Sequence, residues 1–196
     1  MEFEDYQKYR WFVTSSGKLV IGGKSAEQNE ALLKKLKSSE EDRIIMHTAQ
    51  PGSPFSVILS PINSVNSSDM IEGAIFTASF SRAWRQEKKK INVDIFYLSS
   101  LYKLSSMKTG TWGVKNILKK SSATLALVLT KQKGKLRAVP ENSLKSSAPL
   151  LKISPGKTDK IHFISQIQAL LNNKFSKEEI LAALPPGCLK INKNDI

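Results

Sequence analysis

Residue types that commonly carry catalysis or bind metals are scarce in this chain of 196 residues. It contains two histidines, His47 and His162, and a single cysteine, Cys188. These three residues do not have the spacing of a zinc site, and neither a Gly-x-Ser-x-Gly elbow nor a nucleophilic cysteine lies near His47. Since acid–base catalysis needs a positioned partner, we expect no enzyme activity, no metal and no cofactor. His47 is then a structural residue or a contact to a phosphate or a base.

The sequence Gly22-Gly23-Lys24 resembles a phosphate-binding loop, because glycines at a helix N-terminus can bind anions. It matches neither a Walker A run nor a Gly-x-Gly-x-x-Gly spacing. We therefore interpret the two glycines as a sharp bend between a strand and a helix.

Positive charge is the most distinctive chemical feature of the chain. Thirty Lys and Arg residues against 17 Asp and Glu residues give a formal net charge of +13 and a pI near 9.8. This excess indicates a polyanionic partner, with nucleic acid first and an anionic membrane surface second. A role in solubility alone is the remaining alternative.

Several of these cations stand at the ends of expected helices and strands, where they could converge. The six that would form one positive surface are Lys24, Arg82, Arg85, Lys115, Lys119 and Lys120. Lys131, Lys133 and Lys135 lie on a hairpin tip that we expect to be separate from it.

The remaining composition favours a soluble cytoplasmic protein. One cysteine cannot form an internal disulfide, which fits a reducing compartment. Residues 1–5 are acidic and lack the apolar segment of a secretory signal. No run approaches the ~18 apolar residues of a membrane-spanning helix. We expect no membrane association.

The elements that position these residues begin with a β-hairpin. Residues 9–14 are aromatic and β-branched, and residues 19–21 form a second apolar run, as two strands would. The small residues between them suit a tight turn, which predicts that Val13 and Val20 pair on neighbouring antiparallel strands.

Alternating strands and helices are expected along the rest of the chain. Further strands are predicted at residues 43–48, 55–59, 91–97, 109–115, 122–130, 136–139 and 150–153, and helices at 25–37, 69–85, 158–171 and 179–184. The helix over 69–85, capped by residues 67–69, carries small residues that would let it pack closely on a sheet, so we expect it to be the most buried.

Short motifs in these segments are similar to one known family. They are Arg10-Trp11-Phe12, Gly23-Lys24 with Asn29-Glu30, the block 47–54, the helix segment 78–84 and the segment 109–115. They resemble the NFACT-R domain, the presumed RNA-binding module of the NFACT family, whose long members act in ribosome-associated quality control. The likeness covers residues 9 to about 120 well, and the tail loosely resembles archaeal members. The chain lacks the family's N-terminal domain, helix-hairpin-helix and coiled coil, so we expect a free-standing NFACT-R protein of archaeal type.

The patterns and the resemblance together predict an α+β fold. A largely antiparallel sheet should carry one long central helix, with residues 1–143 forming the core domain and residues 144–196 a helical extension packed on it.

The resemblance and the charge imply a non-catalytic RNA-binding protein of translation or ribosome quality control. Its expected partner is tRNA or rRNA, with the large ribosomal subunit as a candidate assembly and DNA as an open alternative; the oligomeric state is unknown. The expected contacts are Arg10, Lys24, His47, Arg82, Arg85, Lys115, Lys119 and Lys120. Trp11, Trp84 and Trp112 either stack on bases or lie in the core. A protein-interaction adaptor is the main alternative, and a small nuclease or hydrolase is disfavoured because carboxylate and histidine clusters are missing.

Overall fold

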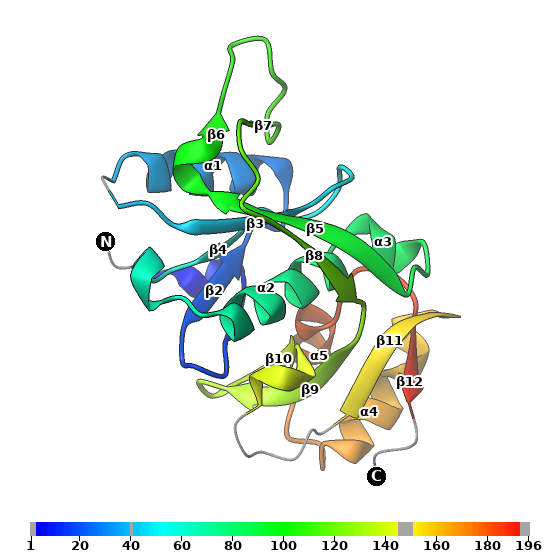
Figure 1. Ribbon diagram of the computed structural model, residues 1–196. Helices are drawn as coiled ribbons and strands as arrows, with labels where there is room; N and C mark the ends of the chain where they lie inside the picture. Colours follow the sequence, from blue (N-terminus) through cyan, green and yellow to red (C-terminus); the bar gives the residue numbers. More distant parts are fainter. Residues whose placement is uncertain (1–2, 40, 145–150, 193–196) are drawn as a thin grey trace.

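Two antiparallel sheets form the framework of the protein (Figure 1). The computed structural model describes residues 3–39, 41–144 and 151–192. The larger sheet has six strands in the spatial order β1 (Arg10–Val13), β2 (Leu19–Gly22), β4 (Ser56–Ile58), β3 (Ile44–Thr48), β5 (Lys90–Tyr97) and β8 (Lys119–Thr124). The smaller sheet has four, in the order β10 (Lys135–Val139), β9 (Leu127–Gln132), β11 (Leu151–Thr158) and β12 (Leu189–Asn192). The expected α+β class with antiparallel sheets is confirmed.

Helices cover both faces of the six-stranded sheet, so successive strand residues enter different cores. Trp11 packs in the cluster that holds the leucines of α1 (Ala26–Lys37). Phe12 belongs to the other cluster, where its ring lies 4.7 Å from that of Phe76 in α2 (Ser67–Ser79). Figure 1 shows the sheet between α1 and α2, with the smaller sheet beyond α2. Burial on both faces explains why these strands are apolar at consecutive positions.

The central helix is shorter than predicted. A helix packed on the sheet is present, but the single helix expected over 69–85 is wrong, because α2 is followed by a separate turn, α3 (Arg82–Arg85). Ser81 has extended backbone angles, and its hydroxyl accepts a hydrogen bond from the Ala83 N–H at 3.1 Å, so it caps a new helix. The start also differs, since Asn66 is the N-cap and forms a capping box with Asp69.

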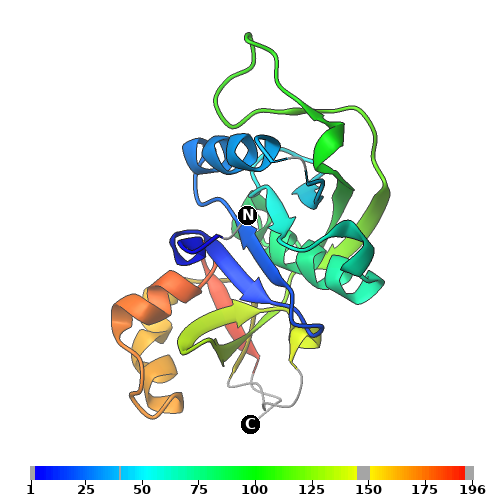
Figure 2. The same cartoon turned by 90° about the vertical axis from the view of Figure 1, so that its left-hand side faces the viewer.

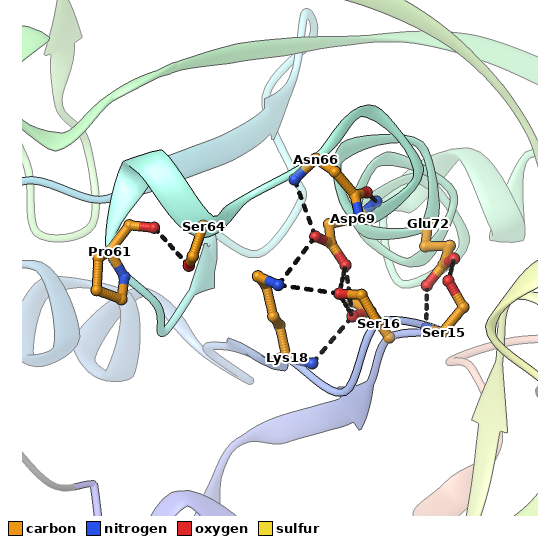
Figure 3. A network of polar contacts seen from close by, with 9 residues as sticks. Ser15, Ser16, Lys18, Pro61, Ser64, Asn66, Asp69 and Glu72 are labelled. Atoms are coloured by element: carbon orange, nitrogen blue, oxygen red, sulfur yellow. Dashed lines mark hydrogen bonds and ion pairs between the residues drawn. The ribbon is translucent and has the colours of Figure 1, made fainter.

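A polar network holds the turn of the first hairpin against α2 (Figure 3). The hydroxyl of Ser16 donates to Asp69 at 2.5 Å, and the Lys18 ammonium lies 3.6 Å from the same carboxylate. Ser15 donates its backbone N–H and its hydroxyl to the two oxygens of Glu72, at 2.9 and 2.5 Å. Burial raises the pKa of Glu72, against these hydrogen bonds, which lower it. The network fixes the hairpin relative to the buried helix.

The hairpin itself forms as predicted, with a shift of one position. β1 and β2 pair antiparallel, and Val13 and Val20 lie on these neighbouring strands. Their direct partners are Leu19 and Phe12, respectively, so the two valines are one residue apart in register.

The need for glycine after β2 has a different cause from the predicted sharp bend. Neither Gly22 nor Gly23 has a positive φ. A Cβ on Gly23 would instead lie 2.2 Å from the side-chain oxygen of Asn29, which accepts the Phe55 N–H at 3.1 Å. Gly23 therefore lets the backbone after β2 lie close to Asn29 of α1, whose side chain bonds to the residue that precedes β4.

The apolar run expected as one strand over 122–130 is divided between the two sheets. β8 ends at Thr124, and the Leu125 N–H bonds to the Lys89 carbonyl at 2.9 Å before β9 begins. β9 and β10 then form the predicted hairpin, with positive φ at Lys133 and Gly134 in its turn. The strand expected over 109–115 is reduced to β7 (Gly113–Val114), which pairs with β6 (Leu101–Tyr102).

The C-terminal residues add strands as well as the expected helices. The helices are α4 (Ile164–Leu170), which follows a short 3₁₀ turn at Lys160–Phe163, and α5 (Lys177–Ala183), which starts with the predicted capping box of Ser176 and Glu179. Of the strand predicted over 150–153, Leu150 lies outside the described residues. β11 pairs with β9 on one side and with the unpredicted β12 on the other. The smaller sheet therefore takes strands from both sides of residue 144, where the division into two domains stays a prediction.

The remaining short elements are 3₁₀ turns at Tyr6–Lys8, Ile62–Ser64, Leu98–Ser100 and Glu141–Ser143. Figure 2 shows the segment between β6 and β7 extending from one end of the molecule, while α4 and α5 lie toward the other end.

Candidate nucleic-acid interface

A cavity of about 720 Å³ opens where β2 and β3 end and β1 begins. The start of α1, the β3–β4 loop, α3 and the segment before β7 form its walls. Its polar and aromatic lining includes Arg10, Lys24, Asn29, His47, Phe55, Phe80, Arg82, Arg85, Asp94 and Trp112. These side chains come from segments that are distant in the sequence and meet only because of the sheet order.

Five of the eight residues expected to contact RNA line this cavity: Arg10, Lys24, His47, Arg82 and Arg85. The other three, Lys115, Lys119 and Lys120, are exposed and are not among the lining residues. They follow the cavity-lining Val114 along the chain, and two of them begin the edge strand β8.

Arg10 is held in a poorly solvated position at the start of β1. Its guanidinium lies over the ring of Phe80, 4.6 Å from the centroid. Burial, together with the nearby charge of Arg85, lowers the pKa of Arg10 to about 10. Arg10 stays charged at neutral pH, and within the described residues it forms no ion pair with a carboxylate.

Other cations gather around Arg10 and repel one another. Burial lowers the pKa of Lys24, and the charges of Arg10 and Arg137 lower it further. Lys160, from the C-terminal part, also has a lowered pKa because of burial and the charges of Arg10 and Arg85, although Asp159 opposes the shift. Such a cluster disfavours its own charged state until an anion binds.

The two arginines of α3 are positioned against glycine backbone. Gly52 has a φ of +108°, and a Cβ there would lie 2.6 Å from the Arg82 side chain. The Arg82 N–H also donates to the Gly52 carbonyl at 2.8 Å. A Cβ on Gly187 would lie 2.8 Å from the Cγ of Arg85. Both arginine stems therefore occupy space that only glycine leaves open.

His47 is suited to accepting a hydrogen bond, not to pairing with a phosphate by charge. Its ring stacks on Phe55 with centroids 4.4 Å apart, and its Nδ1 lies 2.8 Å from the carbonyl of Thr48. Burial lowers the pKa of His47, against the Thr48 carbonyl and the Asp94 carboxylate, which raise it. In the neutral ring Nδ1 donates to that carbonyl, so Nε2 is left as an acceptor.

Asp94 is a member of the site that the sequence analysis did not identify. It pairs in register with His47 on β3 and with Lys120 on β8, so the three side chains project from the same face of the sheet. Its Oδ1 is buried and has no hydrogen-bond partner in the part of the chain that the structure describes. Asp94 occupies a polar position in the alternation of residues 91–97, which predicts a solvent-facing side chain, so the sequence pattern contained no signal for it.

Of the three tryptophans, only Trp112 reaches the cavity. Trp11 and Trp84 are 1% and 0% exposed, respectively, and belong to the core. Trp112 is half-buried and lies under the Lys103 ammonium, which is 5.7 Å from the ring centroid.

Glu30 fixes the segment that carries Trp112. Its carboxylate accepts hydrogen bonds from the Lys103 ammonium at 2.9 Å and from the Gly110 N–H at 3.0 Å. Lys103 in turn donates to the carbonyl of Thr111 at 3.0 Å. Burial acts to raise the pKa of Glu30, but the hydrogen bonds outweigh it and lower the pKa to about 2. This buried charge makes the segment a fixed wall of the cavity.

The charge around the site is strongly one-sided in the sequence. No Asp or Glu occurs between Asp94 and Glu141, whereas this stretch contains Lys103, Lys108, Lys115, Lys119, Lys120, Lys131, Lys133, Lys135 and Arg137.

Among the described residues, no three His, Cys, Asp or Glu side chains are grouped so that they could hold a metal ion. In the same residues, no helix has the length and apolar character needed to cross a membrane.

Residues 8–116 match the family model described as the NFACT protein RNA binding domain. The chain belongs to the NFACT-R family. Apart from Pro186, every residue that lines the cavity lies within the matched range. The resemblance drawn from the short motifs is thereby confirmed, whereas Lys119, Lys120, Arg137 and Lys160 lie beyond the match.

Curated relatives extend the likeness to the C-terminal part. The chain is 27% identical to the archaeal Rqc2 homolog aRqcH of Methanocaldococcus jannaschii over 199 residues, which cover 96% of this chain and 29% of the relative. It is 26% identical to the ribosome quality control complex subunit NEMF homolog of Drosophila melanogaster over 134 residues, 63% of this chain and 13% of that protein. The chain thus spans less than a third of either relative.

A solved structure supports the fold. The C-terminal part of the fibronectin/fibrinogen-binding protein from Streptococcus suis aligns with a TM-score of 0.53 and 20% identity, covering 63% of this chain and 48% of that one. At this identity the likeness concerns the fold alone.

Proposed function

We propose that this NFACT-R protein binds RNA of the translation apparatus, tRNA or rRNA, through the cation-lined cavity and the basic edge beside it. The observation that carries the proposal is the cluster of Arg10, Lys24, Arg82 and Arg85 around one cavity, with no ion pair to a carboxylate among the described residues. Lys24, Arg82 and Arg85 are exposed and Arg10 is half-buried, so the cavity presents unpaired positive charge to an incoming ligand. Their convergence favours an external polyanion.

The family match and the relatives give the polyanion its class. The matched domain is described as RNA binding, and the relatives carry names from ribosome quality control. We infer a cytosolic, ribosome-associated role on this basis. RNA phosphates would bind the cations and release counterions, with little selectivity for base sequence.

The basic edge would extend the contact beyond the cavity. Lys119 and Lys120 are exposed at the start of β8, which is an edge strand of the six-stranded sheet, and Lys115 precedes them. An RNA strand that leaves the cavity along this edge would pass all three lysines.

The proposed function requires no catalysis. The Nδ1 atom of His47 bonds to the Thr48 carbonyl. Among the described residues that line the cavity, the only carboxylate is that of Asp94, which pairs with His47 on the neighbouring strand. No serine or cysteine nucleophile paired with His47 occurs among the described hydrogen bonds.

A protein-docking role is the second candidate, and one observation favours it. Leu104, Ile117 and Leu118 are 53%, 45% and 47% exposed in the segment that leads from β6 to β8. Exposed apolar side chains flanked by lysines suit an acidic protein surface, with the charge steering encounter.

A salt titration with matched charge reversals tests the proposal. Lys115→Glu with Lys119→Glu is expected to weaken binding to tRNA or an rRNA fragment about tenfold or more and to lower the salt slope by about one per lost phosphate contact. Lys177→Glu with Lys190→Glu changes the net charge equally but lies on exposed positions of α5 and β12, and should do much less. Equal losses from both pairs would mean that total charge alone governs binding. Absence of salt-dependent RNA binding in the unchanged protein would favour the docking role.

A further inference from the structure

The cavity contains two chemically different groups of side chains. Arg10, Lys24 and Arg85 line the cavity as a cationic group, in which the charge of Arg85 lowers the pKa of Arg10 and the charge of Arg10 lowers the pKa of Lys24. Asp94 and His47 form a group of hydrogen-bond acceptors on the paired strands β5 and β3. No ion pair joins Asp94 to any of these cations in the described part of the chain, so the two groups stay separate.

The acceptor group lacks a donor. Oδ1 of Asp94 is buried and receives no hydrogen bond from any described residue, although Lys120 stands opposite on β8. The other carboxylate oxygen of Asp94 is not among the buried unpartnered atoms, and no described residue bonds to it, although Asp94 lines the cavity. A ligand with an N–H or O–H group at this end can donate to this oxygen.

Two half-buried rings also line the cavity, those of His47 and Trp112. Phe55 and Phe80 lie behind them at 4% and 7% exposed, and they are covered by His47 and Arg10, respectively. Unstacked bases in RNA-binding proteins commonly stack on such rings, and each base–aromatic stack stabilises the complex measurably.

The volume exceeds the needs of a phosphate alone. About 720 Å³ falls within the range of pockets that enclose small organic ligands. A surface for backbone phosphates requires neither this volume nor an acceptor group, so contact with phosphates does not account for Asp94 and the aromatic lining.

We propose that the cavity receives one unstacked nucleotide of the bound RNA. Its phosphate lies on the cationic group of Arg10, Lys24 and Arg85, its base stacks on the aromatic lining, and an amino or imino group of the base donates to Asp94. This assignment rests on the proposed RNA binding and adds a requirement for an unpaired nucleotide. A nucleotide that is paired in a continuous helix cannot enter.

Two RNA duplexes that differ at one position test the requirement. One carries a single bulged nucleotide, and in the other a complementary nucleotide pairs with it; both are measured by competitive fluorescence anisotropy with the full chain at fixed salt. The bulged duplex is expected to bind about tenfold more tightly. Equal affinities would overturn the nucleotide assignment while leaving RNA binding intact, and no binding to either duplex would overturn both proposals.

An abasic bulge separates the base from the phosphate in the unchanged protein. The abasic site keeps the phosphate and the sugar but lacks the aromatic base and its N–H donors, so it should lose most of the tenfold advantage. If the abasic and the intact bulge bind alike, the cavity holds only the backbone and the assignment of the base is refuted.

The variant Asp94→Asn tests the acceptor end. It keeps the shape of the side chain but replaces one acceptor by a donor, and it is expected to reduce the preference for the bulged duplex about fourfold, with folding checked by thermal unfolding. Lys131→Gln, on the separate β9–β10 tip, should weaken both duplexes by the same factor. An unchanged preference in the folded Asp94→Asn variant would show that Asp94 does not contact the base; if that variant does not fold, the abasic comparison decides.

Discussion

Glu30 offers a test in which charge and geometry predict opposite results. Replacing it by Gln raises the net charge of +13 by one, so a purely electrostatic model predicts tighter RNA binding. The structure predicts weaker binding, because the carboxylate holds Lys103 at 2.9 Å and the Gly110 N–H at 3.0 Å and so fixes the wall that carries Trp112.

The magnitude follows from the charge that Gln lacks. Lys103 and the Gly110 N–H donate to the same oxygen, Oε2, so a Gln carbonyl can still accept from both but without charge assistance. The ion pair of Lys34 with Oε1 at 3.3 Å is lost, while the Lys103 ammonium keeps the carbonyls of Lys108 and Thr111 at 2.8 and 3.0 Å. With allowance for partial solvent screening, we expect the free energy of unfolding to fall by about 1–2 kcal/mol. If ordering the loosened cavity wall takes about 1 kcal/mol of the binding free energy, the affinity for RNA falls roughly fivefold.

The pH dependence gives an independent check of the same carboxylate. Glu30 has its pKa lowered from 4.5 to about 2, because the hydrogen bond from Lys103 leads the effects that outweigh burial. A lowered folded-state pKa means that the stabilisation is fully present above pH 4.5 and is lost as the pH falls from 4.5 through about 2. The difference between the unchanged protein and Glu30→Gln should therefore shrink over this window.

Urea unfolding at several pH values and anisotropy with a labelled RNA measure the two effects. The control is Glu4→Gln, which makes the same change of charge at an exposed position outside the described ion pairs. Tighter RNA binding by Glu30→Gln, or equal effects of the two variants, would refute the role of Glu30 as the support of the cavity wall.

Three further substitutions have defined outcomes. Gly23→Ala should destabilise the protein by about 1–3 kcal/mol in urea unfolding, because its Cβ would displace the Asn29 oxygen; a change below about 0.5 kcal/mol would contradict the close approach. Asp69→Ala should lower the free energy of unfolding by about 2–4 kcal/mol at pH 7, because the Thr14 hydroxyl that bonds to Asp69 at 2.6 Å is left buried without this partner. The hydrogen bonds of Asp69 lower its pKa against the effect of burial. The destabilisation should therefore diminish as the pH falls below the ordinary pKa of 3.8. His47→Ala should stay folded by circular dichroism and change no turnover of RNA; hydrolysis by the unchanged protein that disappears in this variant would overturn the non-catalytic function.

Signals that act within a few residues were readable from the sequence. The hairpin of β1 and β2, the Ser25 cap of α1 and the Ser176 capping box of α5 depend on local turn and capping chemistry, and the structure contains them. The break between α2 and α3 was not predicted, although its cause is also local. The Ser81 hydroxyl accepts a backbone N–H and so starts a new helix, whereas apolar periodicity reports only which residues are apolar.

Contacts between distant segments were not readable in the same way. The apolar run that contains Leu125 reads as one strand, and only the assembled fold shows that the chain changes sheets there. The cavity is a similar case. Arg10, Lys24 and Arg85 were expected from motifs and charge, but the cation Lys160, 150 positions after Arg10, joins them only through tertiary structure.

The cation cluster around Arg10 destabilises the folded protein, which suggests that the cluster is kept for binding. Arg10 and Lys24 both have lowered pKa values because burial and neighbouring positive charges disfavour their charged forms, so the cluster opposes folding at neutral pH. The chain does use carboxylates to pair buried charge elsewhere, as Glu30 does for Lys103. Carboxylates at the cavity mouth would have relieved the repulsion but would also have excluded RNA phosphates. Local electrostatic strain that a nearby acidic residue could remove is typical of a binding site, where the ligand supplies the missing charge.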